Sequence, residues 1–233
     1  MKALCIIPAR GGSKRIPRKN IRTFHGRPIL AYPVEAARDS GCFDEIMVST
    51  DDPEIAAVAR ACGANVPFLR SPETSHDHAG SEEVIDEVIR GYRTQGLTFT
   101  HVCALYPTAA LATPAQLRRG LAALEADPSL AGVLSVQRFS FPVQRALVFR
   151  NNRLPLLQPE HYQARSQDLE PAFHDAGQWY WLRCEPFVRT RELMGPNFTG
   201  LVLSETEAQD IDNEDDWTLA ELKFELRRRR TPA

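Results

Sequence analysis

The chain has 233 residues, of which 43% are hydrophobic and 25% are charged, a composition typical of one globular domain with a sizeable core. Its 28 Lys and Arg residues nearly balance its 30 Asp and Glu residues, and the formal net charge of -2 argues against a protein that coats nucleic acid or an anionic membrane. Any anion-binding site must therefore be local.

The first predicted element is a buried strand over 3–9, and a loop rich in glycine and basic residues, "RGGSKRIPRKN", follows it at once. Gly11, Gly12 and Ser13 would let backbone N–H groups approach phosphate oxygens closely. The spacing matches neither the P-loop nor the dinucleotide-binding motif. A solvated basic turn is the alternative, but charge, glycines and the end of a strand coincide here, which favours an anion site.

Four more apolar runs are predicted strands, at 45–50, 65–69, 101–106 and 132–136. Helices are predicted between them at 52–63 and 81–96. A helix within 27–41 should start late or bend, because Pro28 suits a first helical position whereas Pro33 falls inside the segment. This alternation predicts an α/β, Rossmann-like fold with a mainly parallel sheet, helices on both faces, and ligands at the carboxyl ends of the strands.

The alternation stops between 139 and 175, where proline-interrupted fragments form a stretch too long for an ordinary connection. We predict an insertion here, within a single domain that spans 1–233. The chain then returns with a strand over 177–184. It closes with an amphipathic helix over 213–230, which has acids at its start and arginines at its end.

Five scattered cysteines, none of them in a C-x-x-C pair, indicate reduced thiols rather than a disulfide framework or a zinc site. The apolar run 3–7 is too short for the core of a signal peptide, and no run approaches the length of a membrane span. We therefore expect a cytoplasmic protein that binds neither nucleic acid nor membrane.

The segment "IIPARGGSKRIPRKN" resembles the N-terminal signature of cytidylyltransferases that activate nine-carbon acidic sugars, the CMP-sialic acid synthetases and their relatives. The motifs "GRPILAY", "FDEIMVSTDD", "FLRSPETSHDHAGS", "LYPTAAL" and "QDIDNEDD" occur in the order of that family and cover most of the chain. Within the family, "RSQDLEPAFHDAGQWYW" and "FPVQRAL" most resemble the pseudaminic acid cytidylyltransferases of bacterial flagellin glycosylation. At Tyr106 and Ala110 the chain departs from the sialic acid enzymes, where Gln commonly precedes the Pro and "PLR" follows.

The resemblance implies a fold of the nucleotide-diphospho-sugar transferase type. It also implies that CTP condenses with the anomeric hydroxyl of a nonulosonic acid, with release of pyrophosphate. Because charge develops on phosphoryl oxygens, catalysis should depend on positioning and on cations.

By the same resemblance Arg10 and Lys19 are catalytic phosphate contacts. The further nucleotide-binding residues that it implies are Ala9, Gly11, Gly12, Ser13, Lys14, Asn20, Arg70 and Ser81. Ser81 is also a candidate N-cap of the helix that follows it. Arg15 and Arg18 are expected only to be solvated, and His76 and His78 receive no role.

Asp210 and Asp212 are two residues apart and would project to the same side of an extended backbone. Two such carboxylates suit Mg²⁺, which binds hard oxygen ligands and substrate phosphates. The alternative is that these acids complement the dipole of the last helix, as we expect of Glu214, Asp215 and Asp216. The resemblance favours a catalytic, metal-binding role for Asp210 and Asp212.

The resemblance makes the insertion at 139–175 a dimerisation and sugar-site subdomain of a homodimer. The sugar-binding residues that it implies are Gln144, Arg145, Arg165, His174, Asp175 and Gln178. Those from the insertion can belong to the partner's site. Arg165 is a candidate for the sugar carboxylate, with a surface arginine as the alternative.

Three alternatives remain at this point. The sugar could be N-acetylneuraminic acid or another ulosonic acid, or the enzyme could be a nucleotidyltransferase that uses a hexose 1-phosphate. The third is a non-catalytic nucleotide-binding module, against which the intact pair Asp210 and Asp212 argues.

Overall fold

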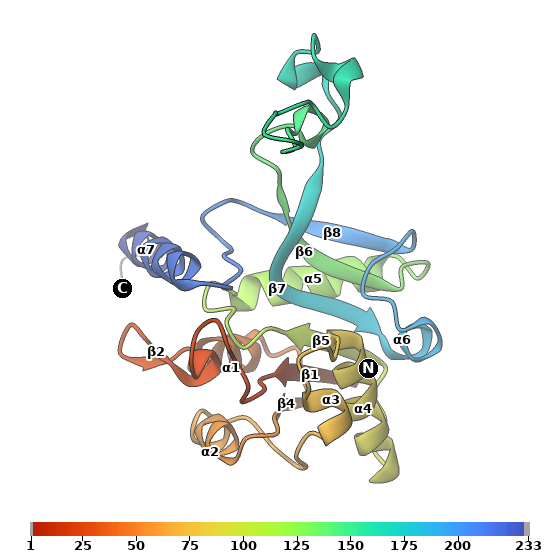
Figure 1. The fold of residues 1–233 in the computed structure, drawn as a ribbon. Helices are drawn as coiled ribbons and strands as arrows, with labels where there is room; N and C mark the ends of the chain where they lie inside the picture. Colours follow the sequence, from red (N-terminus) through yellow and green to blue (C-terminus); the bar gives the residue numbers. More distant parts are fainter. Residues whose placement is uncertain (1, 231–233) are drawn as a thin grey trace.

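The computed structural model describes residues 2–230, whose centre is a six-stranded sheet with strand order β4-β1-β5-β7-β6-β8 (Figure 1). The strands are β1 (Ala3–Pro8), β4 (Glu45–Ser49), β5 (His101–Leu105), β6 (Gly132–Arg138), β7 (Phe173–Arg183) and β8 (Phe198–Leu203). Neighbours are parallel except at β7, which runs antiparallel to both β5 and β6. This arrangement confirms the predicted α/β fold with a mainly parallel sheet.

Helices cover both faces of the sheet. The helices on one face are α1 (Ala31–Ser40), α2 (Pro53–Ala61) and α5 (Pro114–Ala126). The other face carries α4 (Ser81–Thr94) and α6 (Cys184–Thr190), and the short helix α3 (Pro72–Ser75) precedes α4. The last helix, α7 (Glu214–Arg230), packs on a separate cluster of apolar side chains.

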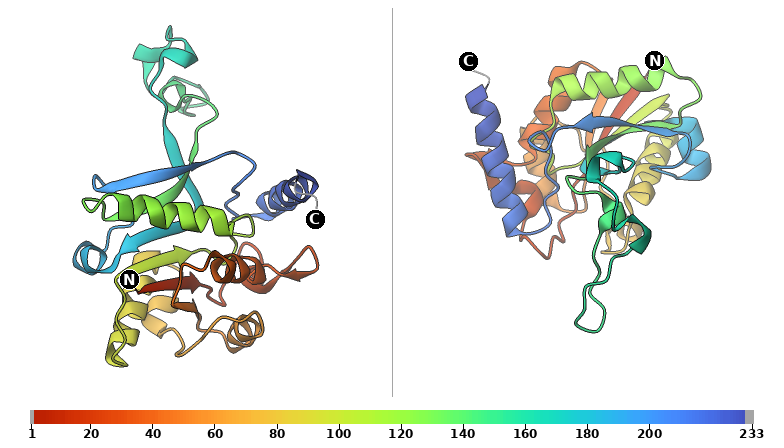
Figure 2. Two further views of the ribbon diagram at one scale, coloured as in Figure 1. Left: turned by 180° about the vertical axis from the view of Figure 1, so that it is seen from behind. Right: turned by 90° about the horizontal axis from the view of Figure 1, so that it is seen from above.

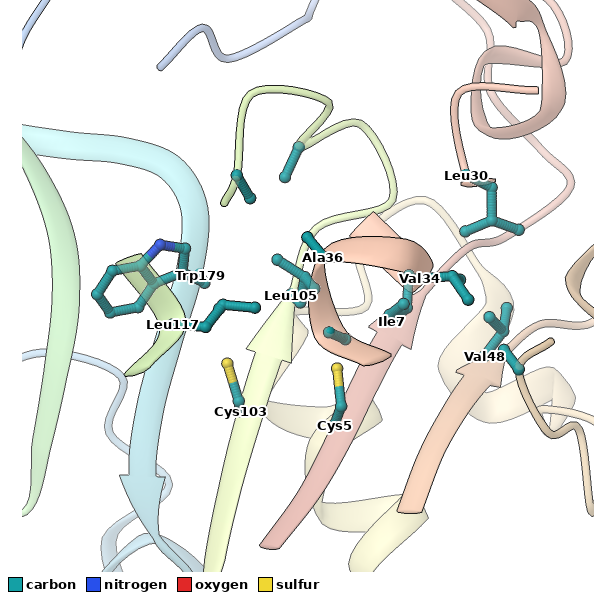
Figure 3. Packing of buried hydrophobic residues seen from close by; sticks show 14 of the residues in the cluster. Cys5, Ile7, Leu30, Val34, Ala36, Val48, Cys103, Leu105, Leu117 and Trp179 are labelled. Carbon is teal, nitrogen blue, oxygen red and sulfur yellow. The ribbon is translucent and has the colours of Figure 1, made fainter. Parts of the chain in front are cut away.

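Strand β1 is buried on both faces of the sheet, which explains why its sequence is apolar without interruption. Cys5 and Ile7 point to the face covered by α1 and α5 (Figure 3). Leu4 and Ile6 point to the opposite face, which α4 covers. Alternate residues of a strand face opposite sides of a sheet, so a strand buried on both sides needs apolar residues at every position.

Two details differ from the sequence predictions, and a third is confirmed. The run 65–69 is not a strand, because Asn65 forms only one isolated bridge with Met47 before the chain turns away. Pro28 does not begin a helix: it lies in β3 (Arg27–Pro28), which pairs with β2 (Thr23–Phe24). The expected late helix start is confirmed, since α1 begins at Ala31. Pro33 then lies in its first turn, where its missing N–H has no intrahelical partner to lose.

Residues 139–172, which we call the arm, extend away from the sheet before β7 returns to it (Figures 1 and 2). Three short 3₁₀ turns, Val143–Arg145, Pro159–His161 and Ser166–Asp168, are its regular elements. Between the first two turns the chain folds back on itself through single bridges. Phe141 and Phe149 on the arm are 82% and 78% exposed. The role of the arm in dimerisation stays a prediction.

Helix α7 lies beside the β2–β3 hairpin (Figure 2). Phe24 packs edge-on against Trp217 and Phe224 of α7, with ring centroids 5.6 and 5.4 Å apart. Ile16, from the basic loop, is fully buried in the same cluster. Helix α7 is therefore anchored directly to the segment that follows β1. Within residues 2–230, no helix combines the length and the apolar character that a membrane crossing requires.

Candidate active site

A cavity of about 560 Å³ opens at the carboxyl ends of β1 and β5, where Pro8 and Tyr106 line it. Nine of the residues predicted for catalysis, nucleotide or metal line this one cavity: Arg10, Ser13, Lys14, Lys19, Asn20, Arg70, Ser81, Asp210 and Asp212. The structure thus brings together the basic loop near the start of the chain and the acidic pair near its end.

The backbone of the basic loop is held against the turn that follows β4. Gly11 donates its N–H to Asp51 Oδ1 at 2.9 Å, and a Cβ at Gly11 would lie only 2.7 Å from Asp52 Oδ2. Glycine is therefore required here for close packing. Ala9 is fully buried and donates its N–H to the Ser49 carbonyl at 2.8 Å, so its backbone amide is already occupied.

Two of the basic side chains differ from the expectation that they are only solvated. Arg15 donates to Asp212 Oδ1 at 2.6 Å and lines the cavity. Arg18 is in the left-handed region at φ 56° and forms ion pairs with Asp52, at 2.5 Å, and with Glu54. The hydrogen bond from Arg18 lowers the pKa of Asp52, which also caps α2. Arg18 thus fastens the loop to α2 rather than facing the cavity.

Asp77 is a cavity residue that the sequence analysis did not single out. Its Oδ1 accepts from Arg10 Nη1 at 2.6 Å, and its Oδ2 accepts from Lys14 Nζ. The hydrogen bonds from Lys14 and Arg10 lower the pKa of the Asp77 carboxyl to about 2. The only signal in the sequence was an acid between His76 and His78 in a motif that also supplies Arg70.

Arg70 and Asn20 are fixed by buried contacts. Arg70 donates from Nε to Ser49 Oγ at 3.1 Å and from Nη2 to the Ser49 carbonyl at 2.7 Å. Burial lowers the pKa of Arg70 to about 10, which still leaves the guanidinium charged at neutral pH. Asn20 is buried and donates from Nδ2 to the Arg10 carbonyl at 2.9 Å, so its position and that of Arg10 depend on each other.

Ser81 lies at the start of α4 but is not its N-cap. Gly80 takes that position, and its N–H donates to Glu83 Oε2 at 3.1 Å. The hydroxyl of Ser81 is instead 3.3 Å from that of Tyr106, which is 3.4 Å from that of Tyr180. A chain of hydroxyl groups therefore leads from Ser81 and Tyr106, which line the cavity, to the buried Tyr180, and the two tyrosines were not predicted as site residues.

The acidic pair lies directly against Lys19. The Lys19 ammonium donates to the Ile211 carbonyl and lies 3.9 Å from Asp212 Oδ1. Loss of solvent raises the pKa of Asp210, and repulsion by Asp212 raises it further. Loss of solvent lowers the pKa of Lys19, although the two aspartates oppose this shift. The acidic pair is therefore a place where additional positive charge would be stabilised.

Helix α7 positions the loop that carries the acidic pair. Asp216 Oδ2 accepts from the backbone N–H groups of Asp212 and Asn213, both at 3.0 Å. Lys223 Nζ donates to the Ala208 carbonyl and to Gln209 Oε1, both at 2.8 Å. Asp216, in the first turn of α7, thus binds the backbone just before the helix. Lys223, further along the same helix, binds the residues just before Asp210.

The donor set at Asp210 and Asp212 fits Mg²⁺ shared with a substrate. Within residues 2–230, no group of three or more His, Cys, Asp or Glu side chains is arranged around a possible metal position. A site enclosed by protein ligands alone is thus not formed by the described residues. Mg²⁺ commonly binds through one or two carboxylates together with substrate phosphates and water.

Asp175 lies beside the acidic pair. Its Oδ1 accepts from the Gly177 N–H at 2.9 Å, its Oδ2 accepts from the Tyr180 hydroxyl, and its charge contributes to the raised pKa of Asp210. Gly177 has φ 62°, and a Cβ there would lie 2.8 Å from Asp210 Cβ. The turn between Asp175 and Gly177 therefore packs against Asp210.

None of the six predicted sugar-binding residues, Asp175 included, lines this cavity. His174 is exposed, with Nδ1 2.8 Å from the Asp175 carbonyl oxygen. Gln178 is fully buried and donates to the Glu207 carbonyl at 2.9 Å. The three arm residues, Gln144, Arg145 and Arg165, contact Glu170, Ser166 and Asp168 of the arm itself. Their action in a partner's site stays a prediction.

Comparison with known proteins agrees with this geometry. A family model described as cytidylyltransferase matches residues 4–129. Two pseudaminic acid cytidylyltransferases from strains of Campylobacter jejuni are each 39% identical over 227 residues, which cover 97% of both chains. A CMP-N,N'-diacetyllegionaminic acid synthase from Legionella pneumophila is 32% identical over 97% of both chains.

Among solved structures, a CMP:2-keto-3-deoxy-manno-octonic acid synthetase in complex with CTP superposes with a TM-score of 0.70. The match covers 98% of this chain and 100% of that one, at 19% identity. At such low identity the likeness concerns the fold alone.

Proposed function

The chain belongs to the cytidylyltransferase family, and we propose that it condenses CTP with pseudaminic acid to give CMP-pseudaminic acid and pyrophosphate. As a member of this family it is a nucleotidyltransferase that uses CTP and forms a CMP-sugar. Its 39% identity to the two Campylobacter jejuni enzymes, against 32% to the legionaminic acid enzyme, supports the choice of sugar.

The observation that carries the proposal is the meeting of cations and carboxylates in one cavity. Arg10, Lys14 and Lys19 approach it from the basic loop, and Asp210 and Asp212 approach it from the end of the chain. Its volume of about 560 Å³ is within the usual range of roughly 300–1,000 Å³ for small-molecule sites. A triphosphate and a divalent ion need this combination of charges.

In the proposed reaction the anomeric oxygen bonds to the α-phosphorus of CTP. The bond from this phosphorus to the bridging oxygen breaks, pyrophosphate leaves with its electron pair, and the proton of the hydroxyl passes to solvent. Arg10 and Lys19 face the phosphates and offset the charge that develops on them, with Lys14 beside them. Arg70 and Ser81 bind the nucleoside end, and Asn20 keeps the loop in place.

Asp210 and Asp212 would hold Mg²⁺ together with phosphate oxygens. When bound, the ion supplies positive charge at the phosphates and lowers the pKa of an attacking hydroxyl. The pKa of Asp210, raised by loss of solvent and then by Asp212, supports this assignment, because a bound cation would stabilise the ionised form of both carboxylates.

The sugar is tested by supplying purified protein with CTP, Mg²⁺ and either pseudaminic acid or N-acetylneuraminic acid. We expect pyrophosphate release to be far faster with pseudaminic acid. The reverse preference would reject this sugar and leave the reaction type intact, whereas no release with any nonulosonic acid would reject the reaction itself.

We also propose a homodimer in which the arm reaches the partner's site. The exposed Phe141 and Phe149 support this, since apolar side chains of this size favour burial against a second surface. A cytoplasmic location completes the proposal and suits the free thiols of Cys5 and Cys103.

A mixing experiment tests the exchange of arms. If Arg165 acts in the partner's site, Arg165→Ala and Asp210→Asn proteins are each inactive, but a mixed dimer has one intact site. Activity should therefore return when the two inactive proteins are combined and allowed to exchange subunits. If Arg165 acts in its own chain, the mixture stays inactive at every ratio.

A further inference from the structure

The loop between α3 and α4 reaches across the cavity and contacts the basic loop through one side chain. Asp77 divides its two carboxylate oxygens between Arg10 and Lys14, residues that lie 67 and 63 positions earlier in the chain. These are two of the cations that face the proposed phosphate position. Asp77 itself lines the same cavity, and its side chain is 36% exposed.

The four cations that the basic loop contributes to the cavity lining are divided between two acidic partners. Arg15 and Lys19 lie against Asp212, at 2.6 and 3.9 Å. For Arg10 and Lys14, Asp77 is the one carboxylate that forms an ion pair among residues 2–230. One carboxylate thus bridges two cations in the way that two oxygens of a phosphate group would.

We propose that Asp77 is an internal counter-anion of the basic loop. CTP displaces the Asp77 carboxylate on binding, and this carboxylate competes with pyrophosphate for Arg10 and Lys14 when the product leaves. The inference rests on the proposed function, which makes CTP the substrate and pyrophosphate the product.

The energies favour displacement by a polyphosphate. Lys14 is 78% exposed, and ion pairs between partly exposed groups contribute little, because water competes for both partners. A triphosphate or pyrophosphate brings several charges and more acceptor oxygens than one carboxylate, so it replaces both pairs at once. Asp77 then reduces the affinity for every anion at this position.

The competition has a consequence for turnover. Pyrophosphate is left on the same cations once the new bond has formed. A carboxylate on the adjoining loop that can return to Arg10 and Lys14 weakens the hold on this product. Without Asp77 the loop would bind pyrophosphate more tightly and release it more slowly.

The test measures binding of inorganic pyrophosphate to the full-length protein by calorimetry in metal-free buffer, without sugar. Asp77→Asn removes the charge and keeps the size of the side chain. Because the two ion pairs that are lost are exposed and individually weak, the variant should bind pyrophosphate roughly 2- to 30-fold more tightly. Asp77→Glu, which keeps the charge, should stay close to the unchanged protein.

Three comparisons make the result specific. Asp39→Asn makes the same change in net charge on α1, where Asp39 pairs with Arg38 at 3.0 Å, and should leave pyrophosphate affinity unchanged. In a Lys14→Met background, Asp77→Asn should give a smaller gain, because one of the two released cations is missing. Asp77→Ser should show the same tightening as Asp77→Asn.

Unchanged or weaker pyrophosphate binding in Asp77→Asn would overturn the proposal, and equal tightening in Asp39→Asn would do the same. Because no sugar is present, failure here is distinguishable from failure of the proposed reaction. In the complete assay, the inhibition constant of pyrophosphate should fall by the same factor as its dissociation constant.

Discussion

Arg15 donates to Asp212 at 2.6 Å, which joins two parts of the chain that lie 197 residues apart. The contact is possible because α7 packs on the segment that follows β1, with Trp217 against Phe24. Apolar packing thus places Asp210 and Asp212 beside the basic loop.

We predict that Asp210→Asn abolishes turnover and stabilises the fold. Loss of solvent and the neighbouring Asp212 raise the pKa of Asp210 in the folded state. The ionised carboxylate therefore lowers stability once the pH rises through that pKa, and a neutral amide removes the penalty. Pyrophosphate release should fall at least about 100-fold, as for loss of a group that stabilises developing charge. The melting temperature at pH 7 should rise.

The matched control for this prediction is Asp215→Asn. Asp215 is an exposed acid in the first turn of α7 and lies outside the cavity lining. The Asp215→Asn protein should keep full activity, and its melting temperature should change little. A melting temperature that falls in Asp210→Asn would contradict the stability half of the prediction.

Lys223 should act on the metal through the loop that it holds. Its ammonium donates to the Ala208 carbonyl and to Gln209, just before Asp210. Lys223→Met removes both bonds, so we expect the Mg²⁺ concentration needed for half-maximal activity to rise about 10- to 100-fold, as when partners of metal ligands are lost. The kcat at saturating Mg²⁺ should change much less.

Arg229→Gln provides the comparison for Lys223→Met. Arg229 is an exposed residue of the same helix, 3.9 Å from Glu225, and its loss should not shift the Mg²⁺ dependence. If Lys223→Met lowers kcat without changing the Mg²⁺ requirement, the loop does not depend on Lys223 for its position.

A third prediction concerns acid stability. Burial and the neighbouring Arg183 lower the pKa of His101 in the folded protein. The unfolded chain therefore binds a proton more readily, so this contribution to stability is present above about pH 6.5 and is lost as the pH falls below it. Urea unfolding at pH 7.5 and at pH 5.5 should show a smaller loss of stability in His101→Gln than in the unchanged protein. An equal loss would exclude His101 as the cause.

The sequence predicted the cavity better than the sheet around it. Lys19 and Asp212 belong to recognisable motifs, and buried parallel strands predict that loops after β1 and β5 meet at one edge. The antiparallel direction of β7 was not predictable, because an apolar run reads the same in both directions. Asp77 and Lys223 were missed for another reason: each acts through a tertiary contact, with Lys14 in one case and the Ala208 carbonyl in the other.

The last prediction uses two glycines to separate backbone strain from a clash at the site. Gly177 and Gly96 both have positive φ, 62° and 77°. A Cβ at Gly96 would meet nothing within 4 Å, whereas at Gly177 it would lie 2.8 Å from Asp210 Cβ. Gly96→Ala should therefore lower the free energy of unfolding only by the strain of a left-handed alanine, about 1–2 kcal/mol, and keep full activity. Gly177→Ala should lower the free energy of unfolding by more than this, and it should also displace Asp210.

The comparison of these two variants is made by urea unfolding and by pyrophosphate release at several Mg²⁺ concentrations. Gly177→Ala should need more Mg²⁺ for half-maximal activity, because the added methyl group pushes directly on Asp210. Gly96→Ala should keep the original Mg²⁺ requirement despite its lower stability. Equal activities in the two variants would show that the turn at Gly177 does not set the position of Asp210, and the contact between β7 and the acidic pair would then be packing without a catalytic consequence.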